Sequence, residues 1–329
     1  VNDYKQALLR DPNFSDAHNN LGIISQGKGA FEVASNHFKK AIQINPKYAE
    51  AYNNLAVSLI DREQIEAAIT NFKEALQINP DYFEAYFGLG CAAKKQGDFN
   101  SSRDNFQAAL KIEPDNVEAL FQSALLAKEQ GFFEEAIPVF QRLVHLDVEN
   151  QKGSLLHLAN MGAAKMPSKT PRDFLKNYYK VRSKNWGQNT SKYFGFRLIE
   201  EAIKKTVPRN LATKGLDLGC GAGGLAEFLS SYVESLDGVD LSEHMLKKAD
   251  SLNLYTNLFE KDLVDFLGES CTKYDLITSA ATLIHFAELD TVFKLVHDRL
   301  NSNGKFAFSV FDASEEEIEL NGFQLFSHS

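Results

Sequence analysis

Apolar and polar positions follow a pattern that repeats every 34 residues through the first half of the chain. The period is plainest in the prolines Pro12, Pro46, Pro80 and Pro114, and in the small residues Gly22, Ala56, Gly90 and Ala124. Small residues at fixed places let two antiparallel helices approach closely, and each proline ends the second helix because it cannot donate to the helical ladder. A period of this length predicts helix pairs stacked into a superhelix. Full units are expected at 15–48, 49–82, 83–116 and 117–150, after half a unit at 1–12.

The pattern changes after residue 172, where short apolar stretches alternate with amphipathic ones. Strands are expected at 215–218, 235–239, 257–261, 275–279 and 305–311, and helices at 174–193, 196–207, 224–231, 243–250 and 289–300. Such alternation predicts a parallel, doubly wound sheet that binds ligands at the carboxyl ends of its strands. Between the halves, the two prolines and two lysines of 165–171 predict a linker at 165–172. We expect a capping helix to extend the first domain to 164, and the second domain to span 173–329.

The most informative motif is a glycine turn that follows the first expected strand. Residues 216–224 read Leu-Asp-Leu-Gly-Cys-Gly-Ala-Gly-Gly. Glycine lets the backbone turn sharply and approach a ligand closely, and the acid Asp217 favours a ligand that carries positive charge. The glycine spacing also satisfies the dinucleotide pattern, with Asp240 at the distance of an acid that binds a nicotinamide-dinucleotide ribose. Asp217 favours the other interpretation, because a carboxylate beside the turn repels a pyrophosphate.

This stretch resembles the first motif of class I S-adenosylmethionine-dependent methyltransferases. Two later stretches extend the resemblance, Asp-Leu-Ser-Glu-His-Met-Leu at 240–246 and Lys-Asp-Leu at 261–263. The resemblance implies that Asp240 binds the ribose hydroxyls and that Asp262 accepts from the adenine amino group. The implied cofactor contacts are Asp217, Gly219, Cys220, Gly221, Gly223, Asp240, Leu241, Met245, Asp262, Leu263 and Ser279.

His285 lies in a loop that often faces the methyl acceptor in this family. A histidine there either removes a proton from the nucleophile or is a satisfied partner of the backbone. Methyl transfer from a sulfonium requires chiefly that the nucleophile, the methyl group and sulfur be collinear, so no catalytic side chain is obligatory.

The repeats of the first half resemble tetratricopeptide repeats, which bind extended peptides in a concave face. In this chain that face is expected to carry Asn19, Asn20, Asn53 and Asn54. Asparagine lowers helix stability, so its recurrence indicates either amides that hold a peptide backbone or an inherited polar face. Together the halves resemble bacterial predicted class I methyltransferases that carry N-terminal tetratricopeptide repeats. This resemblance includes Tyr-Phe-Gly-Phe-Arg at 193–197 and Phe-Ala-Phe-Ser-Val at 306–310.

The expected architecture is therefore an all-α superhelix followed by an α/β, Rossmann-like methyltransferase domain. A class I fold continues through two further strands, so we expect the domain to be incomplete at its C-terminal end, with the fifth strand exposed. We expect methylation of a protein or small-molecule acceptor, with the repeats as a protein-interaction module. Two alternatives remain, a scaffold whose second half binds cofactor without catalysis and a nucleic-acid methyltransferase.

The charge of the chain is strongly segregated. Residues 151–215 carry 14 basic and 3 acidic side chains, whereas residues 216–329 carry 7 and 20. The basic segment, with aromatic residues interleaved, either meets nucleic acid or an acidic substrate or packs beside the acidic domain. The chain contains no run of about 18 apolar residues, so we expect no membrane span. The three cysteines lack metal-ligand spacing, so we expect no metal site and, by default, a reducing cytoplasmic location.

Overall fold

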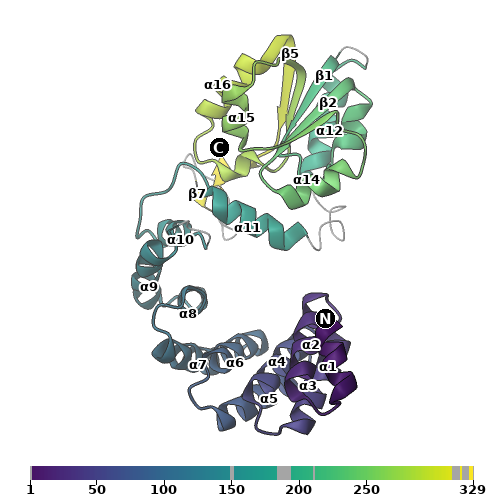
Figure 1. Cartoon of the computed structure of the whole chain (residues 1–329). Coiled ribbons are helices and arrows are strands. Elements are labelled where there is room, and N and C mark those ends of the chain that lie inside the picture. The colour runs from purple at the N-terminus through teal and green to yellow at the C-terminus, as the bar shows by residue number, and fades with distance from the viewer. Residues whose placement is uncertain are drawn as a thin grey trace. The chain divides into compact units, whose positions relative to one another are not determined.

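The computed structural model describes residues 2–148, 152–183, 194–209, 212–312, 319–320 and 326–328. The chain forms two compact units, one of residues 1–146 and one of residues 147–329 (Figure 1). None of the described helices is both long enough and apolar enough to cross a bilayer.

The first unit consists of antiparallel helix pairs. After α1 (Asn2–Arg10), the pairs are α2 (Ser15–Gly27) and α3 (Phe31–Ile44), α4 (Ala49–Ile60) and α5 (Ile65–Ile78), α6 (Phe83–Gln96) and α7 (Phe99–Ile112), and α8 (Val117–Glu129) and α9 (Phe133–Leu146). Each expected unit thus holds one helix pair, and the predicted all-α architecture is confirmed.

A phenylalanine in the second helix of each pair explains why the small residues recur. The rings of Phe38, Phe72, Phe106 and Phe140 are all completely buried. A Cβ on Gly22 would collide with Phe38, and one on Gly90 would collide with Phe106. Tight contact of a ring with a small residue therefore fixes how closely the two helices of a pair approach.

The second unit is built on a five-stranded parallel sheet in the order β3-β2-β1-β4-β5. Its strands are β1 (Ala212–Leu218), β2 (Val233–Asp240), β3 (Asn257–Glu260), β4 (Tyr274–Ser279) and β5 (Leu300–Phe308). The order reverses between β1 and β4, which confirms the predicted doubly wound sheet. The strand β5 ends this sheet, and β6 (Phe311–Asp312), β8 (Phe326–His328) and β7 (Glu319–Leu320) form a separate small sheet.

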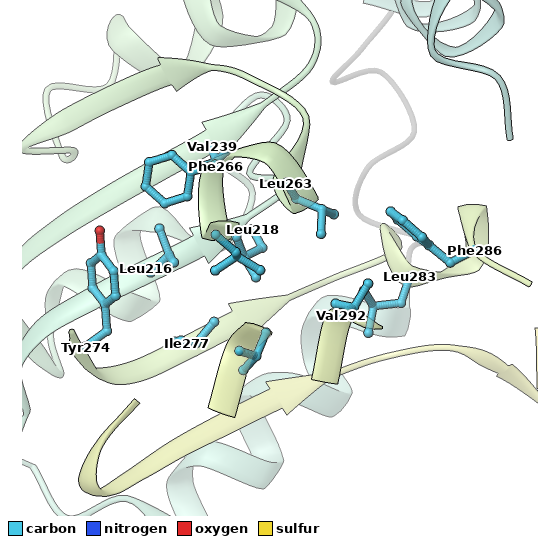
Figure 2. Close-up of a cluster of buried hydrophobic side chains, with 12 residues drawn as sticks. Leu216, Leu218, Val239, Leu263, Phe266, Tyr274, Ile277, Leu283, Phe286 and Val292 are labelled. Carbon is cyan, nitrogen blue, oxygen red and sulfur yellow. The ribbon is translucent and has the colours of Figure 1, made fainter. Parts of the chain in front are cut away.

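Helices cover both faces of the sheet. These helices are α12 (Phe194–Thr206), which precedes β1, and the connecting helices α13 (Ala226–Ser230), α14 (Glu243–Asp250), α15 (Leu263–Glu269) and α16 (Asp290–Arg299). Successive residues of β4 face opposite sides, since Leu276 joins the core under α12 and α13 whereas Ile277 joins the core under α15 and α16. Figure 2 shows the second core, where Leu216 and Leu218 of β1 pack with Phe266 of α15. The hydrophobic pattern did not predict α15, which is only 7 residues long.

The segment that precedes the sheet belongs to the second unit, which corrects two expectations. In α10 (Ser154–Asn160), Leu156 packs with Ala287 of the loop after β4, so this helix belongs to the second unit and was wrongly assigned to the repeat stack. The expected linker at 165–172 pairs with the loop after β4, where Thr170 N donates to His285 O across 2.8 Å. The prolines of this segment prevent a helix but permit an extended backbone. Sequence spacing does not reveal a pairing partner more than a hundred residues away.

Candidate functional site

The glycine turn after β1 has backbone angles that favour glycine. Gly219, Gly221 and Gly223 have φ of +69°, +55° and +84°. The amides of Gly219 and Cys220 both donate to Val239 O, at 2.7 and 3.0 Å, which ties the turn to β2. A Cβ on Gly219 would collide with Thr282, whereas a Cβ on Gly221 would meet no atom within 4 Å. The turn is therefore packed tightly on one side and open beside Gly221.

Asp240, at the end of β2, holds the turn in shape. Its Oδ2 accepts from Gly221 N at 2.9 Å, and its Oδ1 accepts from Ser242 N at 2.8 Å. Burial raises the pKa of Asp240, and the backbone N–H groups that donate to it act in the opposite direction. The neighbouring Cys220 is buried, and burial together with the two nearby carboxylates raises the pKa of its thiol. Cys220 is therefore an apolar packing residue of the turn.

Asp217 is almost completely buried, and two hydroxyl groups donate to it. Tyr255 Oη donates to Oδ2 and Thr278 Oγ1 to Oδ1, both at 2.9 Å. Burial raises the pKa of Asp217 to about 6, while the two hydroxyl groups act to lower it. The sequence indicated the acid but not Tyr255 and Thr278, since no spacing links them to the turn. The sequence provides one indication of such partners, which is that a buried carboxylate requires hydrogen-bond donors.

Asp262 caps the next helix and faces two cations. Its Oδ1 accepts from Val264 N at 2.9 Å, at the start of α15. Its Oδ2 lies 3.4 Å from Lys169 Nζ and 3.6 Å from a guanidinium nitrogen of Arg172. The structure therefore brings Asp217, Asp240 and Asp262 to the carboxyl ends of three adjacent strands, where the sequence placed them.

The other expected cofactor contacts lie in the same region and are largely buried. Ser279 is completely buried, and its hydroxyl donates to Leu218 O at 3.1 Å, which joins β4 to β1. Met245 of α14 and Leu263 of α15 are also buried, whereas Leu241 is partly exposed.

Residues 166–183, here called the strap, lie against the α/β fold and include α11 (Arg172–Ser183), which contacts α14 (Figure 1). Besides its contact with Asp262, Arg172 pairs with Asp265, and Lys176 lies 3.4 Å from Glu260. The basic strap therefore contacts the acidic ends of β3 and α15. Part of the positive charge of residues 151–215 is therefore paired with acidic residues of the same chain.

His285 lies where the strap crosses the loop after β4. Its Nε2 is 2.8 Å from Tyr179 Oη, and its backbone oxygen accepts from Thr170 N. Burial lowers the pKa of His285 to about 4, so the ring is neutral at pH 7. Among the described residues, its buried Nδ1 has no hydrogen-bond partner.

The asparagines of the helical unit serve mainly internal contacts. Asn19 is 1% exposed, donates to Glu50 Oε1 at 3.0 Å and accepts from Asn54 at 3.1 Å. Asn20 donates to the backbone oxygen of Asp16. Asn53 is buried as well, and its Oδ1 is unpartnered among the described residues. The expectation that these amides line an open peptide site is therefore corrected for Asn19 and Asn53, which are buried within the helical unit.

Comparison with known families agrees with this geometry. Residues 191–328 match a model described as a methyltransferase domain, residues 27–60 and 58–97 match a TPR repeat, and residues 87–150 match a tetratricopeptide repeat. The chain carries tetratricopeptide repeats followed by a methyltransferase domain. The strap lies outside the range that matches the methyltransferase domain.

Several curated proteins are similar to part of the chain. An uncharacterized protein of Haemophilus influenzae is 32% identical over 150 residues, 42% of this chain and 55% of that protein. A ubiquinone biosynthesis O-methyltransferase of Coxiella burnetii is 26% identical over 137 residues, 40% of this chain and 58% of that protein. The chain thus spans little more than half the length of these relatives.

Solved structures also resemble part of the chain. MamA has a TM-score of 0.42 at 25% identity, over 45% of this chain and 87% of that chain. YrrB, a TPR protein with an unusual peptide-binding site, has a TM-score of 0.41 at 16% identity, over 61% and 91%.

Proposed function

We propose that the methyltransferase domain binds S-adenosylmethionine and methylates a protein or small-molecule acceptor, and that the repeats recruit a protein partner. One observation carries the cofactor assignment. Asp217 is buried and Asp240 is half-buried beside an open glycine turn, and no Lys or Arg among the described residues pairs with either of them. Carboxylates that are largely withdrawn from water and lack a cation fit a ligand that brings its own positive charge.

The residues at the turn fit this cofactor better than they fit a dinucleotide. S-adenosylmethionine carries an ammonium and a sulfonium, and when bound it supplies a methyl group already activated for transfer to a nucleophile. A pyrophosphate would instead bring two negative charges next to Asp217 and Asp240, which is unfavourable at low dielectric constant. In this proposal the open side of Gly221 receives the methionine moiety and Asp240 receives the ribose.

Asp262 is proposed to accept from the adenine amino group, as the family resemblance implies. Its Oδ1 already accepts from Val264 N, and its Oδ2 lies near Lys169 and Arg172. A carboxylate has about four lone-pair directions, so these contacts leave capacity for one further donor. The ion pairs also reduce the positive charge that the strap offers to nucleic acid, which favours a protein or small-molecule acceptor.

Transfer of a labelled methyl group tests this proposal. The full chain is incubated with methyl-labelled S-adenosylmethionine and a fractionated extract of the source cell. We expect label in one fraction, and no label when Asp240→Ala replaces the wild-type chain. Absence of label in every fraction, together with absence of cofactor binding, would contradict the proposal.

A further inference from the structure

Two residues that each carry an unpartnered polar atom meet where the strap crosses the loop after β4. Thr170 Oγ1 and His285 Nδ1 are buried without a hydrogen-bond partner among the described residues, and the two residues are joined by the bond from Thr170 N to His285 O. Ser154 Oγ of α10 is also buried and unpartnered, and α10 packs on the same loop through Leu156 and Ala287. A buried polar atom without a partner destabilises the fold, so such a group points to a ligand or water that is bound in the working state.

Aromatic rings lie in a row next to these atoms. The ring of Phe174 stacks on Tyr178 with centroids 6.0 Å apart, Tyr178 meets Tyr179 edge-on at 5.2 Å, and Tyr179 meets His285 edge-on at 5.9 Å. All three strap rings are partly exposed. Rings arranged in this way provide stacking and edge contacts for a further aromatic ring.

We propose that Thr170 and His285 form a subsite that receives the hydroxyl group of a phenolic methyl acceptor. This inference rests on the proposed function and names its substrate class. A hydroxyl group both donates and accepts, so it satisfies a threonine hydroxyl and an imidazole nitrogen whichever tautomer the imidazole adopts. The aromatic row of the strap contacts the ring that carries the hydroxyl.

The neutral state of the subsite favours a phenol over a charged acceptor. No carboxylate is bonded to His285 among the described residues, and burial keeps its ring uncharged at pH 7. An ammonium or carboxylate placed there would be buried without a counter-charge. The hydrogen bond between Tyr179 Oη and His285 Nε2 fixes the imidazole orientation, so Tyr179 is a positioning residue.

The strap supplies Thr170 and the three rings, so it forms one wall of the subsite, and it must open to admit the acceptor and close again around it. It is held partly by ion pairs of Lys169, Arg172 and Lys176, whose side chains are each about 44% exposed. Ion pairs this exposed stabilise a structure only weakly. Opening of the strap breaks these ion pairs and the backbone bonds of Ser168 and Thr170 to the loop after β4, but it leaves the pairing of the five-stranded sheet intact.

Calorimetric titration with catechol tests the subsite. The full chain is first saturated with S-adenosylhomocysteine, the demethylated cofactor, so that no turnover occurs. We expect saturable binding of catechol, weakened about tenfold or more by Thr170→Val and by His285→Asn, since one lost hydrogen bond corresponds to roughly that factor. The control Thr206→Val removes an exposed hydroxyl that bonds only its own helix, and it should leave binding unchanged. The saturated analogue trans-1,2-cyclohexanediol should bind at least about tenfold more weakly if the aromatic row contributes.

The thermal midpoint of the Thr170→Val variant gives an independent readout. An unpartnered hydroxyl predicts an unchanged or higher midpoint, whereas a lowered midpoint would reveal a structural hydrogen bond and contradict the subsite. Unchanged catechol binding in both variants, equal binding of the two diols, or no saturable binding would also overturn it. Failure of S-adenosylhomocysteine to bind would contradict the proposed function itself, whereas its binding without catechol binding would contradict the subsite alone.

Discussion

The hydroxyl of Tyr255 donates to the buried carboxylate of Asp217 across 2.9 Å, directly behind the glycine turn. Burial strongly raises the pKa of Tyr255, and the charge of Asp217 raises it further, so the phenol remains a donor throughout the working pH range. The acid that the sequence motif supplies is thus held in place by a tyrosine 38 residues away.

Stability should fall as Asp217 ionises. Its pKa in the folded state is about 6, above the value of 3.8 for an unperturbed carboxyl, so the folded state binds this proton more tightly than the unfolded chain does. The free energy of unfolding should therefore decrease as pH rises from about 4 to about 6. Thermal unfolding between these pH values should show a shallower decrease in Asp217→Asn, with part of the slope retained because the pKa of Asp240 is also raised. An identical slope in both proteins would contradict the assignment.

Two glycines of the turn offer a matched comparison. Both have positive φ, so replacement by alanine strains the backbone by about 1–2 kcal/mol in either case. Only the Cβ on Gly219 would also collide with Thr282. We expect Gly219→Ala to lower the thermal midpoint clearly more than Gly221→Ala, although both weaken cofactor binding. Equal midpoints would show that the packing of Gly219 on Thr282 is not a constraint.

The repeats contain a second matched pair, separated by one period. Asn19→Ala removes hydrogen bonds to Glu50 and Asn54 and should reduce the local stability of α2 by about 1–3 kcal/mol. Asn53→Ala should cost less in α4, because Asn53 Oδ1 has no partner among the described residues. Hydrogen exchange of the amides of both helices in the full chain measures the two losses. A larger loss for Asn53→Ala would reverse the ranking and contradict the internal role of Asn19.

Charge reversal tests whether the strap is held electrostatically. Arg172→Glu should repel Asp262 and Asp265 and increase hydrogen exchange of the Thr170 amide, which bonds to His285 O. Adding Asp265→Arg should restore part of the protection, by an amount of about 1 kcal/mol or less for an exposed pair. High salt should reduce the difference between the variants. Exchange that is indifferent to both substitutions would show that other contacts hold the strap.

The elements of both units follow from local patterns, and for that reason the sequence predicts them. The 34-residue period depends on contacts between adjacent helices, such as that of Gly22 with Phe38, which lie close in sequence. The glycine turn and Asp240 likewise follow from a strand–turn–helix motif whose residues are near one another. A short helix such as α15 carries too few residues to show its own period.

The parts that the sequence did not predict depend on distant partners. Thr278 and Tyr255 reach Asp217 from 61 and 38 residues away. The strap pairs with residues 285–287 through backbone atoms, which leave no trace in residue type. The position of Asn19 in its helix follows from the repeat and predicts an open face. Its hydrogen bond to Glu50 of the next unit does not follow from the repeat, and this bond places Asn19 inside the helical unit.

Direct titration with two cofactors tests the central claim, that the glycine turn with Asp217 and Asp240 binds S-adenosylmethionine. We expect saturable calorimetric binding of S-adenosylmethionine to the full chain, loss of that binding in Asp240→Ala, and no binding of a nicotinamide dinucleotide at the same concentration. Binding of the nicotinamide dinucleotide in competition with S-adenosylmethionine, or absence of S-adenosylmethionine binding, would contradict the account.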